Sequence, residues 1–122
     1  MRIEKKKRDS VRQLRVAHDI KELMARALQV DRPYDTNLEN LIVSITSVQV
    51  SASLQDVKIF VLPMDKEKSS YIMEYLQKHT PYFKTILGQK LQLKFVPNIK
   101  FFFDESYDYA DHINKVFEKA GM

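Results

Sequence analysis

LQLKFVPNIKFFFDES, residues 91–106, is the stretch that decides the fold of this 122-residue chain. Apolar and polar residues alternate before Pro97 and again after it. Period two over this span predicts a strand with one buried face. Proline has no N–H to donate to a sheet ladder, so Pro97 predicts an edge, a bend or a bulge. Asp104-Glu105-Ser106 ends the strand, and Ser106 is placed to cap a following helix. The buried face would carry Leu91, Leu93, Phe95, Ile99, Phe101 and Phe103.

A helix is predicted over residues 11–29, near the N-terminus. Ser10 and Gln13 have the spacing of a capping box, in which each side chain accepts from the other residue's backbone N–H. Asp31-Arg32-Pro33 ends the helix, because proline interrupts helical hydrogen bonding. Its apolar residues recur at helical spacing and would form one buried stripe. The stripe would contain Leu14, Ala17, Ile20, Leu23, Met24, Ala27 and Leu28.

The middle of the chain predicts an antiparallel hairpin of two strands, over residues 41–50 and 56–62. The alternation in the first strand slips by one residue at Thr46-Ser47, which predicts a bulge or a change of face. The second strand is apolar on both faces beyond Lys58, so it should be central or well covered. Residues 51–54 form the turn between them.

Two helices joined by a break are predicted between the hairpin and the last strand. Asp65 can cap the first, which runs to about residue 78. Thr80 is a good N-cap and Pro81 suits the first position of the second, which runs to about residue 90. A short helix over residues 107–119 closes the chain. The order α-β-β-α-α-β predicts an α+β fold with helices covering one face of a three-stranded sheet.

Composition predicts one soluble cytoplasmic domain, and its charge suits either a polyanionic partner or an ordinary solvated surface. The chain has no cysteine, no apolar run long enough to cross a membrane, and no apolar region behind its basic N-terminus that would indicate secretion. The net charge of +4 is unevenly distributed, because residues 1–30 hold nine Lys/Arg against four acids and residues 64–103 hold seven against three. Folded together, these two regions would form a basic surface suited to nucleic acid.

No motif for catalysis or metal binding is present in the sequence. The three histidines are scattered, and none has metal-ligand spacing to another. Asp104 and Glu105 are adjacent and would point to opposite faces of a strand, which suits strand-end capping better than catalysis. With only Gly88 and Gly121, no glycine-rich phosphate loop can form, and Gly88, inside a predicted helix, indicates close packing of that helix on the sheet. Phe101 and Phe103 should be core residues, whereas Phe102 is as well suited to a base-stacking position outside.

The order of elements resembles a type II KH domain, an RNA-binding module, although His79-Thr80-Pro81 stands where such domains carry a Gly-x-x-Gly loop. The passages VSITSVQVS, VKIFV, ILGQKL and LKFVPNIKFFFDES are similar to the ribosome-binding factor A family, with Val-Pro and Asp-x-Ser as distinctive pieces. The likeness covers residues 10–114. Thr80-Pro81 replaces the family's Ala-x-Gly at the helix break, and Asp31-Arg32-Pro33 replaces its Asp-Pro-Arg.

The resemblance implies a non-catalytic bacterial assembly factor. Such a protein binds the immature small (30S) ribosomal subunit through 16S rRNA, near the neck and decoding region. It assists late maturation, rRNA processing and cold adaptation. The resemblance implies no cofactor, no metal and no membrane, and we expect a monomer. Lysine and arginine contacts to phosphates would supply most of the affinity, and RNA shape most of the selectivity.

The predicted RNA-binding residues are basic or lie at the helix break: Lys5, Lys6, Lys7, Arg8, Arg12, Arg15, Lys78, His79, Thr80, Lys84, Lys94 and Lys100. The expected organisation is a basic arm at residues 1–9, a KH-like RNA-binding domain at 10–106, and a helix and tail at 107–122. Two alternatives stay open. One is a general RNA-binding or protein-interaction module whose basic surface meets an acidic partner, and the other is a small enzyme with an unrecognised site.

Overall fold

The computed structural model describes residues 9–106, so the predicted arm residues Lys5, Lys6, Lys7 and Arg8 and the predicted helix over 107–119 lie outside the described residues. The remaining elements follow the predicted order, with two short 3-10 helices in the connections. They are α1 (Val11–Val30), η1 (Thr36–Leu38), β1 (Val43–Val50), β2 (Asp56–Pro63), η2 (Lys66–Lys68), α2 (Ser69–Lys78), α3 (Thr80–Lys90) and β3 (Asn98–Phe103).

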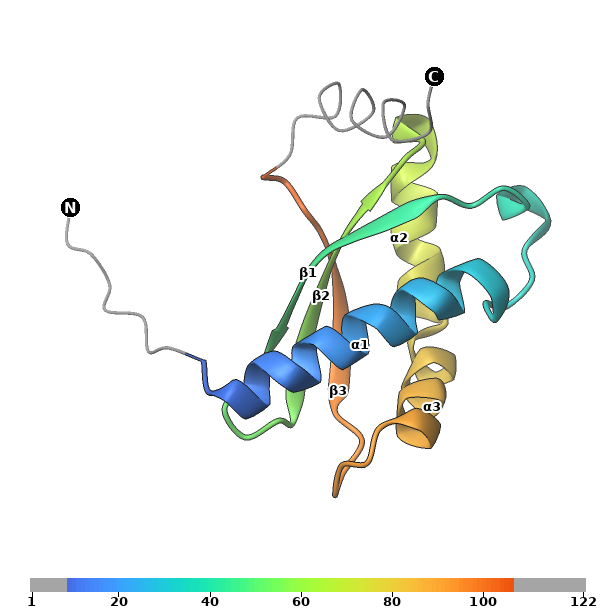
Figure 1. Ribbon diagram of the computed structural model, residues 1–122. Helices are drawn as coiled ribbons and strands as arrows, with labels where there is room; N and C mark the ends of the chain where they lie inside the picture. The colour runs from blue at the N-terminus through green and yellow to red at the C-terminus, as the bar shows by residue number, and fades with distance from the viewer. Residues whose placement is uncertain (1–8, 107–122) are drawn as a thin grey trace, which may run out of the picture.

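The three strands form one sheet in the order β1-β2-β3 (Figure 1). β1 and β2 are antiparallel across the hairpin, whereas β2 and β3 are parallel. Parallel neighbours require a crossover, and α2 with α3 provides it. β2 is therefore the central strand, as its apolar sequence predicts.

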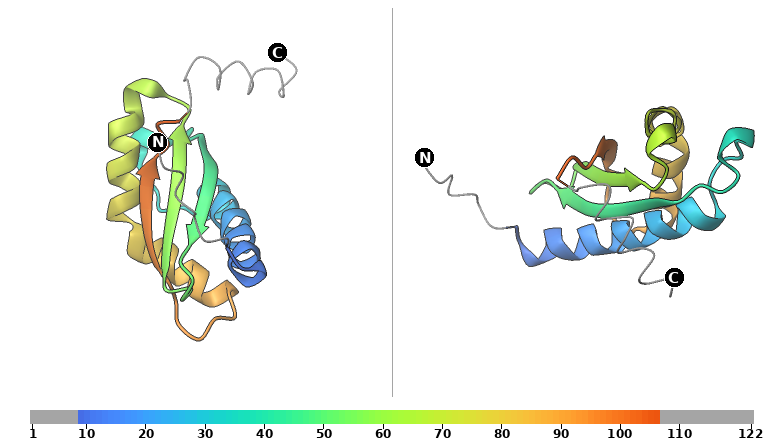
Figure 2. Two further views of the ribbon diagram at one scale, coloured as in Figure 1. Left: turned by 90° about the vertical axis from the view of Figure 1, so that its left-hand side faces the viewer. Right: turned by 90° about the horizontal axis from the view of Figure 1, so that it is seen from above.

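All three helices lie on one side of the sheet, and the left view of Figure 2 shows the strands face on with the helices behind and beside them. Alternate residues of β2 and β3 point to the helices and are buried, among them Ile59, Val61 and Phe101. α1 packs on β1, while α2 and α3 pack on β3. This confirms the predicted α+β architecture with one covered face.

The capping box at the start of α1 is confirmed. Ser10 accepts from the Gln13 N–H, and the Gln13 side chain accepts from the Ser10 N–H. Gln13 is buried, and its Nε2 also donates to the Val50 carbonyl at 2.9 Å, which ties α1 to the end of β1. The predicted stripe is wrong at one end, because Leu14 is 57% exposed while Val16 is buried. The Gln13 contact explains this, since it rotates Gln13 and Val16 toward the sheet.

The predicted irregularity in the first strand is a β-bulge, with the register shifting between Ile45 and Ser47. The extra residue, Thr46, donates its hydroxyl to the Asp104 carboxylate beyond the end of β3. Asp104 also accepts from the backbone N–H and the hydroxyl of Ser106. Burial raises the pKa of Asp104, but these hydrogen bonds outweigh it and leave that pKa below its usual range. The Asp-x-Ser exit therefore joins the two edge strands across the central one.

The last strand is shorter than predicted, because β3 begins only after Pro97. Asn98 pairs with Asp56, the first residue of β2, and its N–H donates to the Gln55 carbonyl. The chain before Asn98 has no strand left to pair with, since β2 turns away there into the hairpin loop. Residues 91–97 are consequently a loop. Phe95, predicted to point inward, is 62% exposed.

Candidate nucleic-acid interface

The basic residues Arg12 and Lys94 come together although they are far apart in sequence. Arg12 lies in the first turn of α1, and Lys94 lies in the α3–β3 loop. Both line a cavity of about 240 Å³ with residues 53–55 of the hairpin turn. The sequence placed Lys94 on the last strand; the structure moves it into this loop, because residues 91–97 have no strand to pair with. We call Arg12, Lys94 and the exposed Phe95 beside them the basic tip.

Phe95 is the residue of the basic tip that the sequence prediction missed. The Lys94 ammonium lies 5.5 Å from the centre of the Phe95 ring, within cation–π range. The neighbouring Val96 is also exposed, at 41%. An aromatic ring beside two cations offers a base both a stacking face and phosphate contacts. The signal for exposure was Pro97, because a proline cannot donate to a sheet ladder and the strand begins only after it.

Gly88 sets the position of the α3–β3 loop. A Cβ built on Gly88 would lie 2.8 Å from Val96 Cγ2, closer than carbon atoms approach without strain. The sequence interpretation of Gly88 was close packing of its helix on the sheet. The close neighbour is instead the loop that carries Lys94 and Phe95.

The helix break lies between α2 and α3 at His79, which has φ −100° and ψ 16°. Thr80 does not cap α3 as predicted. Its hydroxyl donates back to the Leu76 carbonyl at 3.0 Å, so it satisfies the end of α2 instead. Pro81 is near the start of α3, where a missing N–H costs nothing. The His79 ring lies against the Tyr75 ring, with centroids 4.8 Å apart.

Three tyrosine hydroxyls hold this pair of helices against the connection that follows α1. Tyr75 donates to the Pro33 carbonyl and Tyr82 to the Asp31 carbonyl, while Tyr71 donates to the Asp35 carboxylate at 2.7 Å. The Tyr71 hydrogen bond is the largest influence on Asp35 and lowers its pKa. Burial opposes this, and the Asn37 N–H and the charges of Lys78 and His79 lower the pKa further. Asp35 therefore offsets part of the positive charge at the break.

The other predicted contact residues occupy separate places. Lys84 reaches from α3 to the start of β3, where its Nζ lies 3.0 Å from Asn98 Oδ1. Arg15 is exposed on α1. Lys100 is exposed on the uncovered face of the sheet, as predicted for an outward residue of the last strand. The fold thus joins Arg12 with Lys94, but it does not gather all the predicted residues on one surface.

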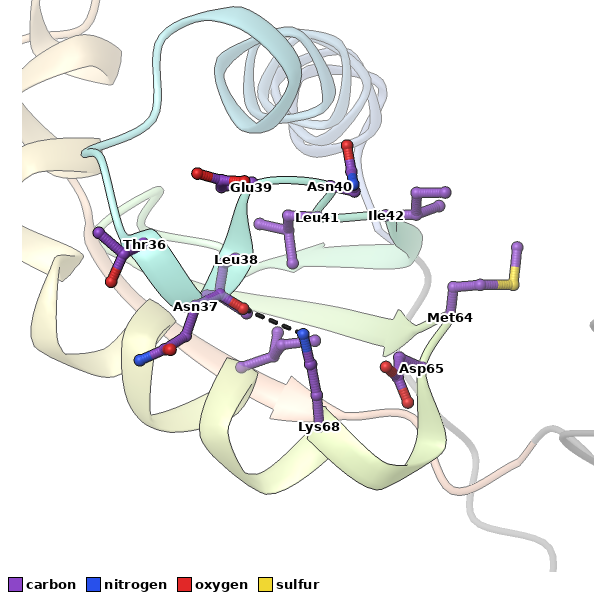
Figure 3. Close-up of a pocket in the computed structure, with 11 residues that line it drawn as sticks. Thr36, Asn37, Leu38, Glu39, Asn40, Leu41, Ile42, Met64, Asp65 and Lys68 are labelled. Carbon is purple, nitrogen blue, oxygen red and sulfur yellow. Dashed lines mark hydrogen bonds between the residues drawn. The ribbon is translucent and has the colours of Figure 1, made fainter.

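A second cavity, of about 300 Å³, lies at the opposite end of β2 (Figure 3). It is formed by the lead-in to β1 and by the β2–α2 connection. Its lysine, Lys68, donates to the Asn37 carbonyl at 3.1 Å, and Asp65 caps η2. The side chains of Lys68 and Asp65 therefore stabilise the connections that line this cavity. Within residues 9–106, no three His, Cys, Asp or Glu side chains are grouped to hold a metal ion, and no helix is long and apolar enough to cross a membrane.

The family model described as Ribosome-binding factor A matches residues 12–117. A ribosome-binding factor A from Moorella thermoacetica is 33% identical over 112 residues, which cover 91% of this chain and 91% of that protein. Another, from Rhodopseudomonas palustris, is 27% identical over 113 residues and covers 93% of this chain and 82% of that protein.

Solved structures show the same fold. The crystal structure of ribosome-binding factor A from Thermus thermophilus aligns with a TM-score of 0.61 at 14% identity, over 74% of this chain and 93% of that one. A homology model of the Thermus thermophilus ribosome-binding factor A, fitted into the cryo-electron-microscopy map of its complex with the 30S subunit, aligns with a TM-score of 0.59 at 14% identity. That match covers 75% of this chain and 93% of the other.

Proposed function

This chain belongs to the ribosome-binding factor A family, and we propose that it binds the immature small ribosomal subunit through 16S rRNA. In this role it assists late maturation and rRNA processing as a monomer, without catalysing a reaction. The relative fitted into the map of a 30S complex supports this choice of partner. We also propose that residues 10–106 form the RNA-binding domain, with 1–9 as a basic arm and 107–122 as a helix and tail.

The basic tip is the observation that carries this proposal. Arg12 and Lys94 stand beside the exposed Phe95 around one cavity, and each comes from a different element. Backbone phosphates supply most of the affinity in RNA binding, and arginine and lysine are the side chains that meet them. The predicted contacts at Arg15, Lys78, His79, Thr80, Lys84 and Lys100 join the proposal as secondary contacts, together with the arm residues Lys5, Lys6, Lys7 and Arg8.

Co-sedimentation with separated ribosomal subunits tests the partner. The expected result is that the protein sediments with small subunits and not with large ones. Equal binding to both subunits, or binding to neither, would refute the proposal.

The salt dependence of binding to isolated rRNA fragments tests the chemistry. Neutralising about five phosphates of a single strand predicts a log–log slope of about −3.5. The double variant Arg12→Gln/Lys94→Gln should reduce the slope to about −2.1, because two phosphate contacts are lost. Lys21→Gln/Lys90→Gln, which removes the same charge from exposed helical sites, should leave the slope unchanged. A flat slope for the unaltered protein would instead favour an acidic protein partner.

A further inference from the structure

The face of the sheet that the helices leave uncovered carries two phenylalanines side by side. Phe60 of β2 and Phe102 of β3 are cross-strand partners, with ring centroids 5.5 Å apart and planes inclined by 28°. Phe102 is 37% exposed and Phe60 is half-buried. Neither belongs to the core cluster on the helix side, which uses Phe101 and Phe83. The central strand β2 and the edge strand β3 therefore present an aromatic pair at the surface.

Two lysines form the adjacent row on the same face. Lys58 and Lys100 are cross-strand partners, and both are exposed. Like charges directly opposite each other destabilise a sheet, so this arrangement has a cost that an anion would offset. Gln49 completes the row on β1, and Ser47 completes the row of the phenylalanines.

The open part of this face has defined limits. Leu62, one row beyond Phe60, is fully buried. Asp56, one row beyond Lys58 in the other direction, contributes the first carboxylate along β2. Between Asp56 and Leu62 lie two rows of side chains, one aromatic and one basic. Within the described strands, neither row contains an acidic side chain. We call these two rows the sheet platform.

We propose that the sheet platform binds unpaired nucleotides of single-stranded RNA, an inference that rests on the proposed function. A base stacks on the face of the Phe102 ring that Phe60 leaves open, while Lys58 and Lys100 contact the adjoining phosphates. Side chains two residues apart on a strand are about 7 Å apart. The lysines are therefore close enough to the rings for one nucleotide to place its base on Phe102 and its phosphate against a lysine. Stacking requires a base free of its duplex partner, so the sheet platform selects single-stranded over double-stranded RNA.

Direct evidence would come from NMR titration of the unaltered protein, with labelled phenylalanine rings, against a hexauridylate strand and a stable RNA duplex without unpaired nucleotides. We expect the Phe102 and Phe60 ring signals to shift upfield with the single strand and not with the duplex. The buried Phe83 ring, on the helix side of the sheet, serves as the internal control. Unshifted Phe102 and Phe60 signals at saturation, or equal shifts with duplex, would overturn the inference.

Variants test the same surface by affinity for the fluorescent hexauridylate. Loss of one stacked base costs about 5- to 150-fold in affinity, so Phe102→Leu, which keeps apolar bulk without a ring, should weaken binding at least about fivefold. Tyr34→Leu removes an aromatic ring that is 77% exposed in the loop after α1 and should change nothing. Lys58→Gln/Lys100→Gln should reduce the salt slope by about 1.4, whereas Lys21→Gln/Lys90→Gln should not.

The outcomes separate this inference from the proposed function. Sedimentation of the unaltered protein with small subunits, combined with unchanged hexauridylate binding by Phe102→Leu, would refute the sheet platform alone. Weakened binding by Phe102→Leu, in a protein that does not sediment with small subunits, would refute the proposed function alone.

Discussion

Replacing Gly88 by alanine tests whether the α3–β3 loop is held by close packing on α3. The new Cβ would lie 2.8 Å from Val96 Cγ2, while carbon atoms attract best at about 3.5–4.0 Å. The loop or the Val96 side chain would therefore have to move by roughly 1 Å. Valine is branched at Cβ and adjusts poorly by rotation about χ1. The displacement should reach Lys94 and Phe95, which precede Val96 in the same loop.

Two opposing effects decide the sign of the stability change. Alanine in place of a helical glycine stabilises by about 0.5–1 kcal/mol. Overpacking costs about 1–3 kcal/mol in a well-packed core, and the lower end applies because Val96 is 41% exposed. Gly88→Ala alone should thus be neutral or destabilising by up to about 0.5 kcal/mol.

The Val96→Ala background removes the obstacle, because the Val96 Cβ lies 3.9 Å from the added atom, an ordinary contact distance. There Gly88→Ala should stabilise by about 0.5–1 kcal/mol. Urea unfolding of the four proteins in this double-mutant cycle gives the coupling energy, expected to be about 1 kcal/mol. Gly88→Ala should also weaken RNA binding, although it removes no charge. If Gly88→Ala stabilised both backgrounds equally, the loop would not be held by this contact.

Three further predictions concern two hydrogen-bonding side chains, Gln13 and Asp104, and the charge of Asp35 at the helix break. Gln13→Ala should lower the free energy of unfolding by about 1–3 kcal/mol, because the Val50 carbonyl loses its buried donor; urea unfolding measures this, with exposed Gln49→Ala as control. Asp104→Asn should also destabilise the protein at neutral pH. The folded pKa of Asp104 is lowered, so its contribution is complete above the unfolded pKa and is lost as the pH falls through the folded pKa. The difference from the unaltered protein should therefore shrink in acid-series urea unfolding, and a constant difference would contradict this reasoning. Asp35→Asn should tighten RNA binding about two- to threefold at low salt, because Asp35 offsets Lys78 and His79; unchanged affinity would remove the break from the interface.

The secondary structure was largely predictable because its signals are local. The capping box at Ser10, the phase slip at Thr46 and the apolar central strand each depend on residues within a few positions of one another. Two of the errors, the predicted burial of Leu14 and the predicted start of the last strand before Pro97, have a common cause. Each depended on a partner far away in sequence, the Val50 carbonyl for Gln13 and the start of β2 for Asn98.

The site was predicted less completely than the fold. Their positive charge was the reason to predict Arg12 and Lys94 as separate contact residues. Only the packing of α1, the hairpin turn and the α3–β3 loop showed that they line one cavity. Phe95 was assigned to the core because alternation alone cannot show whether a neighbouring strand exists to pair with it. Asp35 was not predicted to matter, since its contact with Tyr71 spans 36 positions.

By itself, the sequence determined the order of the elements, the family resemblance and the basic character of the protein, because periodicity, capping and charge are properties of neighbouring residues. Tertiary structure alone decided that Phe60 and Phe102 meet on the open face of the sheet beside Lys58 and Lys100, and where the last strand begins. These features depend on strand register and helix packing, which join residues about 40 or more positions apart. Such contacts form only when the chain is folded, so no local sequence pattern predicts them.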